Sequence, residues 1–355
     1  MTKRITAMTP LTLGIDLGDR RSEVCVLDAA GDVHRRFSVA TTRAALEKAL
    51  AETPPSRIVI EVGTHSPWVS RLLEALGHEG IVANPRRVRS ITQSDEKCDR
   101  VDAEQLARLG RADPRLLRPI RHRGEQAQRD RALLAVRDEL VRLRTALVNQ
   151  ARGITKGLGQ RLPRCAAQSF ARRMRREGLE GGFPGMETLV ASVEWVTGRI
   201  HALEREIESV SAERYPETEL LRQVSGVGRI TALAYVLTIE DPHRFRRSRT
   251  VGAYLGLRPR RRQSGDTDPL LRITKAGDVL LRRLLVQSAH YLLGPFGPDT
   301  SLRRFGLRLA ARGGRGAKKK AVIAVARKLA VLLHRLWLTG ELYEPLRGAE
   351  LPAAA

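Results

Sequence analysis

The first third of the chain alternates between strand-like and helix-like patterns of apolar residues. Five apolar runs bounded by turn residues are predicted to be strands: residues 11–18, 22–29, 33–40, 58–63 and 80–85. Apolar residues at helical spacing predict helices over residues 45–52 and 68–77, and Gly77 ends the second of these. Three hairpin-linked strands followed by β-α-β-α predict an α/β domain with a mixed sheet over residues 1–124.

The middle of the chain has the pattern of two long amphipathic helices. Apolar residues recur at helical spacing from Leu133 to Val148 and again from Met186 to Val210. Glycine-rich stretches at 153–165 and 177–185 predict loops between them. Residues 125–213 are therefore predicted to be a helical region, either an antiparallel or intermolecular coiled coil or an ordinary two-helix arm.

Residues 214–345 are predicted to be mostly helical, and residues 346–355 to be a disordered tail. The region opens with a helix, a tight turn at Gly226 and Gly228, and a second helix, an order that resembles a helix-hairpin-helix motif. Glycines in such a turn let backbone N–H groups approach a phosphate, although a plain helix connection fits the same pattern. The basic run 244–249 favours the nucleic-acid interpretation.

Two further polar segments of this region carry candidate chemistry. Ser264 lies in a turn-rich stretch beside three arginines and upstream of a lysine: Arg260, Arg261, Arg262 and Lys275. A serine among guanidinium groups could attack a phosphodiester, but a turn serine in a basic loop fits the spacing equally simply. Residues 312–321 are predicted to be a flexible basic loop that grips phosphates through Lys318, Lys319 and Lys320, followed by a core helix.

The charge balance points to a polyanionic partner. The 355 residues include 63 Lys+Arg against 39 Asp+Glu, a formal net charge of +24. Such a surface attracts nucleic acid through counterion release, and an anionic membrane surface is the weaker alternative. The three cysteines have no zinc-ligand spacing, and no segment is expected to span a membrane. We expect a cytoplasmic protein.

Four carboxylates stand out against this basic background. Asp16 and Glu61 each end a predicted strand, and Asp99 and Asp102 share one face of a predicted helix. Ligands gather where the strands of an α/β sheet end, and clustered carboxylates suit Mg²⁺ or Mn²⁺. The pattern predicts a metal site that acts on a polyanion, although solvated surface charges would also explain Asp99 and Asp102.

Together these motifs resemble one family over most of the chain. The segments GIDLGDRRSEVCVLD, IEVGTHSPWV, KCDRVDAEQLARL, VSGVGRITA, RRQSGD and RITKAGD occur in the order found in DEDD-type insertion-sequence transposases. These enzymes have an RNase H-like, RuvC-like N-terminal domain and are also known as bridge-RNA-guided recombinases. The resemblance implies that Asp16, Glu61, Asp99 and Asp102 are the acidic tetrad and that Ser264 is the catalytic serine. His65 stands where relatives often have an aromatic residue, a difference that concerns packing.

The resemblance also implies a reaction and a set of partners. The expected enzyme is a prokaryotic, nucleoid-associated DNA transposase that exchanges strands through a covalent phosphoserine. Donor and target DNA, a structured noncoding RNA and a homo-oligomer of two or four subunits would be its partners. A RuvC-like hydrolytic nuclease or junction resolvase is the alternative, and it would use the four acids without the serine. A non-catalytic architectural DNA-binding protein is a second alternative, which would need neither metal nor acids.

Overall fold

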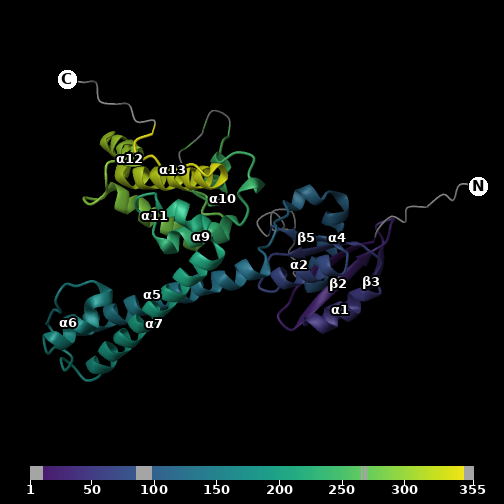
Figure 1. The fold of residues 1–355 in the computed structure, drawn as a ribbon. Coiled ribbons are helices and arrows are strands. Elements are labelled where there is room, and N and C mark those ends of the chain that lie inside the picture. Colours follow the sequence, from purple (N-terminus) through teal and green to yellow (C-terminus); the bar gives the residue numbers. More distant parts are fainter. Residues whose placement is uncertain (1–10, 85–97, 265–266, 268, 270, 348–355) are drawn as a thin grey trace, which may run out of the picture. The chain divides into compact units, whose positions relative to one another are not determined.

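The chain divides into two units, residues 1–123 and residues 124–355, which Figure 1 displays as a ribbon. The structure is a computed structural model, and it describes residues 11–84, 98–264, 267, 269 and 271–347. Most of the tail predicted to be disordered, residues 348–355, lies outside the described residues.

The first unit contains a five-stranded mixed sheet. Its strands are β1 Thr12–Asp16, β2 Arg21–Leu27, β3 Val33–Ala40, β4 Arg57–Glu61 and β5 Glu79–Ala83. They lie in the order β3-β2-β1-β4-β5, with β1 antiparallel to β2 and parallel to β4. The three leading strands form the meander, and β4 and β5 extend the parallel side. The predicted mixed α/β sheet is confirmed.

Helices cover both faces of this sheet. Successive strand residues point to opposite faces, so Leu13 and Ile15 join one core with helices α1 (Arg43–Ala51) and α2 (Ser66–Ala75). Val59, between two residues of that core, packs instead with Leu106 of helix α4. Helix α4 (Asp99–Ala112) therefore lies on the other face, against β1, β2 and β4.

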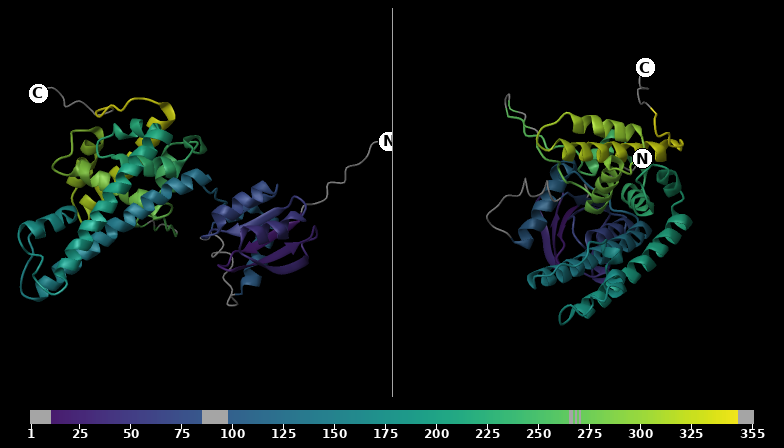
Figure 2. Two further views of the ribbon diagram at one scale, coloured as in Figure 1. Left: turned by 60° about the horizontal axis from the view of Figure 1, so that its bottom comes forward. Right: turned by 90° about the vertical axis from the view of Figure 1, so that its left-hand side faces the viewer.

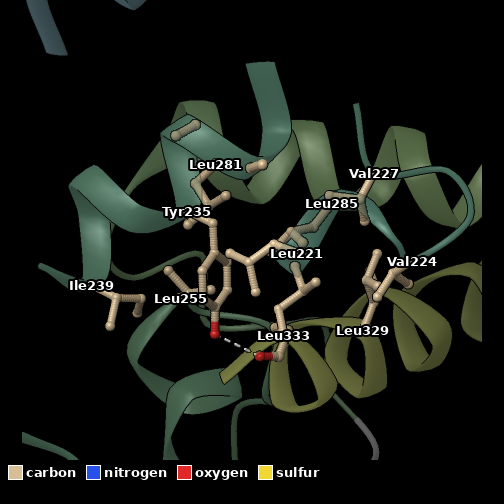
Figure 3. Close-up of a cluster of buried hydrophobic side chains, with 14 of the residues drawn as sticks. Leu221, Val224, Val227, Tyr235, Ile239, Leu255, Leu281, Leu285, Leu329 and Leu333 are labelled. Carbon is tan, nitrogen blue, oxygen red and sulfur yellow. Dashed lines mark hydrogen bonds between the residues drawn. The ribbon is translucent and has the colours of Figure 1, made fainter. Parts of the chain in front are cut away.

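The second unit is helical apart from a short hairpin. Its helices are α5 Glu125–Gly157, α6 Phe170–Arg176, α7 Met186–Arg214, α8 Glu217–Arg222, α9 Arg229–Ile239, α10 Arg249–Tyr254, α11 Val279–Leu293, α12 Ser301–Ala311 and α13 Ala317–Thr339. Nearly all of α9 is buried among α8, α11 and α13. Figure 3 shows Tyr235 of α9 in this core, where its hydroxyl donates to the Ala330 carbonyl oxygen over 2.7 Å.

Helices α5 and α7 pair with each other as a long antiparallel arm. Arg137 of α5 donates a hydrogen bond to Glu204 of α7. Arg214, the last residue of α7, donates one to Asp130 near the start of α5, so the two helices run in opposite directions. Figures 1 and 2 show them side by side. The distal half has its own small core, which includes Phe170 of α6, a helix that the sequence pattern missed. Two long helices are confirmed, while a coiled coil stays a prediction.

No helix in the described parts of the chain is long and apolar enough to cross a lipid bilayer.

Candidate active site

Asp16 and Glu61 end neighbouring parallel strands at the same edge of the sheet. Ile15 pairs with Ile60 in the register of β1 and β4, so each carboxylate is the next and last residue of its strand. Both residues are partly buried. The chain places them there because the apolar runs end at these two positions and strand pairing aligns the ends.

Two glycines let α4 pack close enough to bring its first turn over this edge. A Cβ on Gly14 of β1 would lie 2.0 Å from the carbonyl oxygen of Ala103, and one on Gly110 would lie 2.2 Å from Val59 Cγ2. Only glycine tolerates such approaches. Asp99 and Asp102 occupy the first turn of α4, and Asp102 directly precedes the buried Ala103. The contact between Gly14 and Ala103 therefore fixes the position of Asp102.

The four predicted acids form one electrostatic cluster around Asp16. Burial, together with the like charges of Asp99, Asp102 and Glu61, raises the pKa of Asp16 from 3.8 to about 6. Charges influence each other to this extent only when they are close and poorly shielded by solvent. The structure thus brings together in one unit the four carboxylates that lie far apart in the sequence.

Their donor chemistry fits a divalent cation. Carboxylate oxygens are the ligands that Mg²⁺ and Mn²⁺ prefer, and a cation would relieve the repulsion that raises the pKa of Asp16. Among the described residues, no three His, Cys, Asp or Glu side chains form a metal-binding group as they stand. The arrangement is a cluster of negative charge, and metal binding by Asp16, Glu61, Asp99 and Asp102 stays a prediction.

A fifth carboxylate, Glu23, was missed by the sequence reasoning. It is the direct cross-strand partner of Asp16 on β2, and its charge also raises the pKa of Asp16. Its carboxylate lies 3.8 Å from Arg100, which stands between Asp99 and Val101 on α4. The alternation of β2 could have indicated Glu23, but only once the register with β1 is known.

His65 has the packing role expected of it. Its Nδ1 accepts a hydrogen bond from the Trp68 indole over 3.1 Å, and the two rings meet edge to face. Its Nε2 lies 3.7 Å from the exposed carboxylate of Asp19.

Ser264 belongs to the second unit, where it lies on an exposed two-stranded hairpin. Arg260 N–H donates to the Arg272 carbonyl, and Pro259 pairs with Ile273 in the stem. Farther out, the backbones of Ser264 and Thr267 bond each other in both directions, at 3.1 and 3.0 Å. Backbone pairing in the predicted polar loop therefore extends as far as Ser264 and Thr267, and Arg260, Arg261 and Arg262 are exposed beside the serine.

The predicted helix-turn-helix exists, but packing explains one of its glycines. Gly226 has φ +81° between α8 and α9, and a Cβ there would meet Tyr291 and the Ser288 carbonyl oxygen of α11. Gly228, the N-cap of α9, is exposed and has open space around it. Phosphate binding at either glycine stays a prediction.

The predicted flexible loop over residues 312–321 is partly wrong. Lys318, Lys319 and Lys320 belong to the first turn of α13, which begins at Ala317. All three are exposed, as is Lys275 at the base of the hairpin. Cations at a helix N-terminus oppose the helix dipole, and the buried face of α13 from Ala321 onward overcomes this cost.

Sequence comparisons decide what kind of protein carries these groups. A profile of DEDD transposases of the IS110 type matches residues 13–158, and a profile described as "Transposase IS116/IS110/IS902 family" matches residues 218–300. The transposase for insertion sequence element IS1328 of Yersinia enterocolitica is 31% identical over 288 residues, 78% of this chain and 82% of the relative. The chain belongs to the IS110/IS116 family of transposases.

Relatives span nearly the whole of this transposase. The transposase for insertion sequence element IS1111A of Coxiella burnetii is 29% identical over 339 residues, which cover 93% of this chain and 90% of the relative. A probable family 20 transposase of Pseudomonas aeruginosa is 28% identical over 340 residues, 94% of this chain and 98% of its own. The enzyme is thus a DNA transposase, and the predicted membership of an insertion-sequence transposase family is confirmed, while the guide RNA and the catalytic serine stay predictions. The architectural alternative without enzymatic activity is excluded.

Proposed function

We propose that this transposase exchanges DNA strands through a covalent phosphoserine at Ser264, with its acidic cluster holding Mg²⁺ or Mn²⁺. The observation that carries the proposal is the gathering of four carboxylates around Asp16 in a chain of net charge +24. A basic protein gains DNA affinity from cations, so a cluster of acids kept at the end of its sheet indicates catalysis.

Asp16, Glu61, Asp99 and Asp102 would hold the cation in this reaction. When bound, it would polarise the scissile phosphate and stabilise charge on the attacking and leaving oxygens. Glu23 would orient Arg100 beside Asp99, since its carboxylate already lies 3.8 Å from that guanidinium. The acids must be deprotonated to bind metal, and at neutral pH even Asp16 is mostly ionised.

Ser264 would act as the nucleophile. Its Oγ would form a bond to the scissile phosphorus and lose its proton, while the bond from phosphorus to the 3′ oxygen breaks and leaves a 3′ hydroxyl. A 3′ hydroxyl of the exchanged strand would later attack the phosphoserine and restore the serine hydroxyl. Two features support the role: the backbone bonds to Thr267 hold the serine in place, and the adjacent exposed arginines can neutralise a phosphate.

Partners of the proposed enzyme would be donor and target DNA, a structured noncoding RNA and further subunits. In such a system base pairing reads sequence, while the protein contacts backbones through its cations. The RNA partner is inferred from the family resemblance, and the high Lys+Arg content favours contacts to an RNA backbone. For the oligomer, Val136, Leu143 and Trp195 of the arm stay 51%, 44% and 61% exposed, which favours a contact between subunits.

A substitution at Ser264 separates this proposal from hydrolysis. The transposase, its element RNA, Mg²⁺ and end-labelled DNA are incubated and resolved on a denaturing gel. We expect Ser264→Ala to abolish both cleavage and the protein-linked DNA, while Thr267→Ala, which keeps the backbone bonds, retains them. A hydrolytic nuclease or junction resolvase would cut normally with Ser264→Ala.

A further inference from the structure

A groove of about 1000 Å³ lies beside the serine hairpin in the second unit. Its walls are the hairpin stem, helices α12 and α13, and the segment that follows α13. Leu257, Leu271 and Ile273 belong to the stem, and Leu342 belongs to the C-terminal segment. The groove thus shares a wall with the hairpin that carries Ser264.

The rim of this groove is strongly cationic. Nine Lys or Arg residues line it against two Glu, and one of these, Glu341, already pairs with Arg335 and Arg347. This excess of positive charge attracts an anionic polymer. It disfavours contact with a protein surface that has few acidic residues.

Along α13 the wall alternates cations with apolar residues. Lys319 and Lys320 are followed one turn later by Ile323 and Ala324, then by Arg327 and Lys328, and then by Val331 and Leu332. Residues four apart share a helix face, so the pairs form one repeating stripe. An unpaired nucleic-acid strand offers both phosphates for the cations and exposed base faces for the apolar side chains.

Several contacts hold the cations in place. The ammonium of Lys328 lies 4.2 Å from the centroid of the Phe305 ring. Gly252 of α10 packs against Arg327, since a Cβ there would lie 2.8 Å from its Cγ. Lys275 adopts the left-handed region, with φ +54°, and its N–H bonds the Gly256 carbonyl oxygen over 3.1 Å. Strain kept at a groove residue is typical of a binding site.

Two apolar side chains of the groove stay exposed among the residues that the structure describes. Leu342 is 71% exposed and Leu271 is 38% exposed, although both line the groove. In double-stranded DNA the bases are stacked inside and cannot reach such side chains, whereas an unpaired strand can lay its bases on them.

We propose that this groove binds an unpaired stretch of the DNA strand that Ser264 attacks, with phosphates on the cation pairs and bases on the apolar residues between them. The inference rests on the proposed function, because it assigns the groove to the DNA strand that Ser264 would attack. It adds a binding site for single-stranded DNA to the catalytic groups.

Binding can be measured without catalysis. Full-length Ser264→Ala protein in EDTA is titrated with a labelled single-stranded DNA, and anisotropy gives Kd at several salt concentrations. Lys320→Ala should lower the slope of log K against log salt by about 0.7, the value for one phosphate contact to a single strand. Lys318→Ala is the matched control, because this exposed neighbour does not line the groove and should leave more of the slope intact.

The apolar part of the groove is tested with an abasic strand. Leu342→Ala should weaken binding of normal single-stranded DNA about fivefold, because it removes an apolar contact to a base, and should not affect an abasic strand. Leu346→Ala is the control, since Leu346 is 45% exposed but does not line the groove. Both leucines are exposed, so neither change removes core packing.

Four outcomes would overturn the proposal: equal effects of Lys318→Ala and Lys320→Ala, equal losses for normal and abasic strands, a loss confined to single-stranded RNA, or a change in subunit number by light scattering with DNA binding intact. The last outcome would make the groove a protein interface. Because Ser264 is already replaced, a failure of the phosphoserine mechanism leaves these results unchanged and is detected separately by the adduct assay.

Discussion

Gly14 and Ala103 are in such close contact that a Cβ on the glycine would lie 2.0 Å from the alanine carbonyl oxygen. The contact joins the strand that ends in Asp16 to the helix turn that carries Asp99 and Asp102. The spacing of the acidic cluster therefore depends on a glycine that carries no chemistry of its own.

Replacing Gly14 with alanine should separate the acids. Because α4 must move away from β1, we expect a loss of about 1–3 kcal/mol in the free energy of unfolding, measured by urea denaturation. DNA cleavage should fall further than stability explains. Gly63→Ala is the control, since open space surrounds Gly63 and it follows the same edge of the sheet. Equal effects of the two substitutions would contradict this account of the cluster.

The pKa of Asp16 predicts a dependence of stability on pH. Its folded pKa is about 6 against 3.8 for an ordinary aspartate, so the folded state keeps a proton that the unfolded chain releases. Stability contributed by this group is present below pH 3.8 and is lost as pH rises to about 6. In EDTA, Asp16→Asn should therefore raise Tm at pH 7.5 more than at pH 4.5. Parallel profiles for the two proteins would show that Asp16 is not in a repulsive cluster.

A buried carboxylate joins the two helices of the arm, near the start of α5 and the end of α7. Asp130 is 3% exposed and accepts hydrogen bonds from Arg214, Tyr215 and Gln126. Burial alone would raise the pKa of Asp130, but these bonds outweigh it and lower the pKa. Asp130→Ala should cost about 3 kcal/mol of unfolding free energy, because it leaves the donors unpaired. The exposed pair of Asp299 and Arg304 is the control, and Asp299→Ala should cost less than about 1 kcal/mol.

Removing only the distal arm should reduce the oligomer and spare the fold. The proximal ends of α5 and α7 belong to the main core of the second unit, through Leu134 and Ile207 among others. Replacing residues 142–199 with a Gly-Ser linker keeps the hydrogen-bonded pair Arg137–Glu204 at the shortened end of the arm. We expect fewer subunits by light scattering and an unchanged circular dichroism signal per remaining helix. An unchanged number of subunits would exclude the distal arm as the interface.

The sheet and the place of Asp16 and Glu61 at its edge could be predicted, because the apolar runs determine the strands and the residues at which they end. Asp99 and Asp102 lie on a helix, and only the family resemblance distinguished them from solvated surface charges. Alternation fixes which residues point to each face, and the apolar runs stop at Asp16 and Glu61. Glu23 could not be identified in the same way, since its place opposite Asp16 depends on strand register. The role of Gly14 could not be predicted either, because it depends on a contact with α4, which is distant in the sequence.

The helical character of residues 125–345 was predictable, but the number of helices and their ends were less so. Lys318, Lys319 and Lys320 follow two glycine-rich turns and oppose the helix dipole, so local preference indicates a loop; the buried face of α13 overrides it. The short basic helix α6 has weak propensity alone and exists because Phe170 and Met174 are buried against the arm. Packing also accounts for Gly226, because a Cβ at this position would meet Tyr291 and the Ser288 carbonyl oxygen of α11.

The covalent link itself tests the central claim most directly. The transposase is incubated with its element RNA, Mg²⁺ and DNA, the protein-linked fraction is isolated, and nuclease and trypsin digestion precede tandem mass spectrometry. Cleavage after Arg262 and Arg272 releases a peptide that contains both Ser264 and Thr267. We predict a nucleotide phosphate on Ser264 and none on Thr267. DNA that is cut while this peptide stays unmodified would contradict the phosphoserine mechanism and favour hydrolysis.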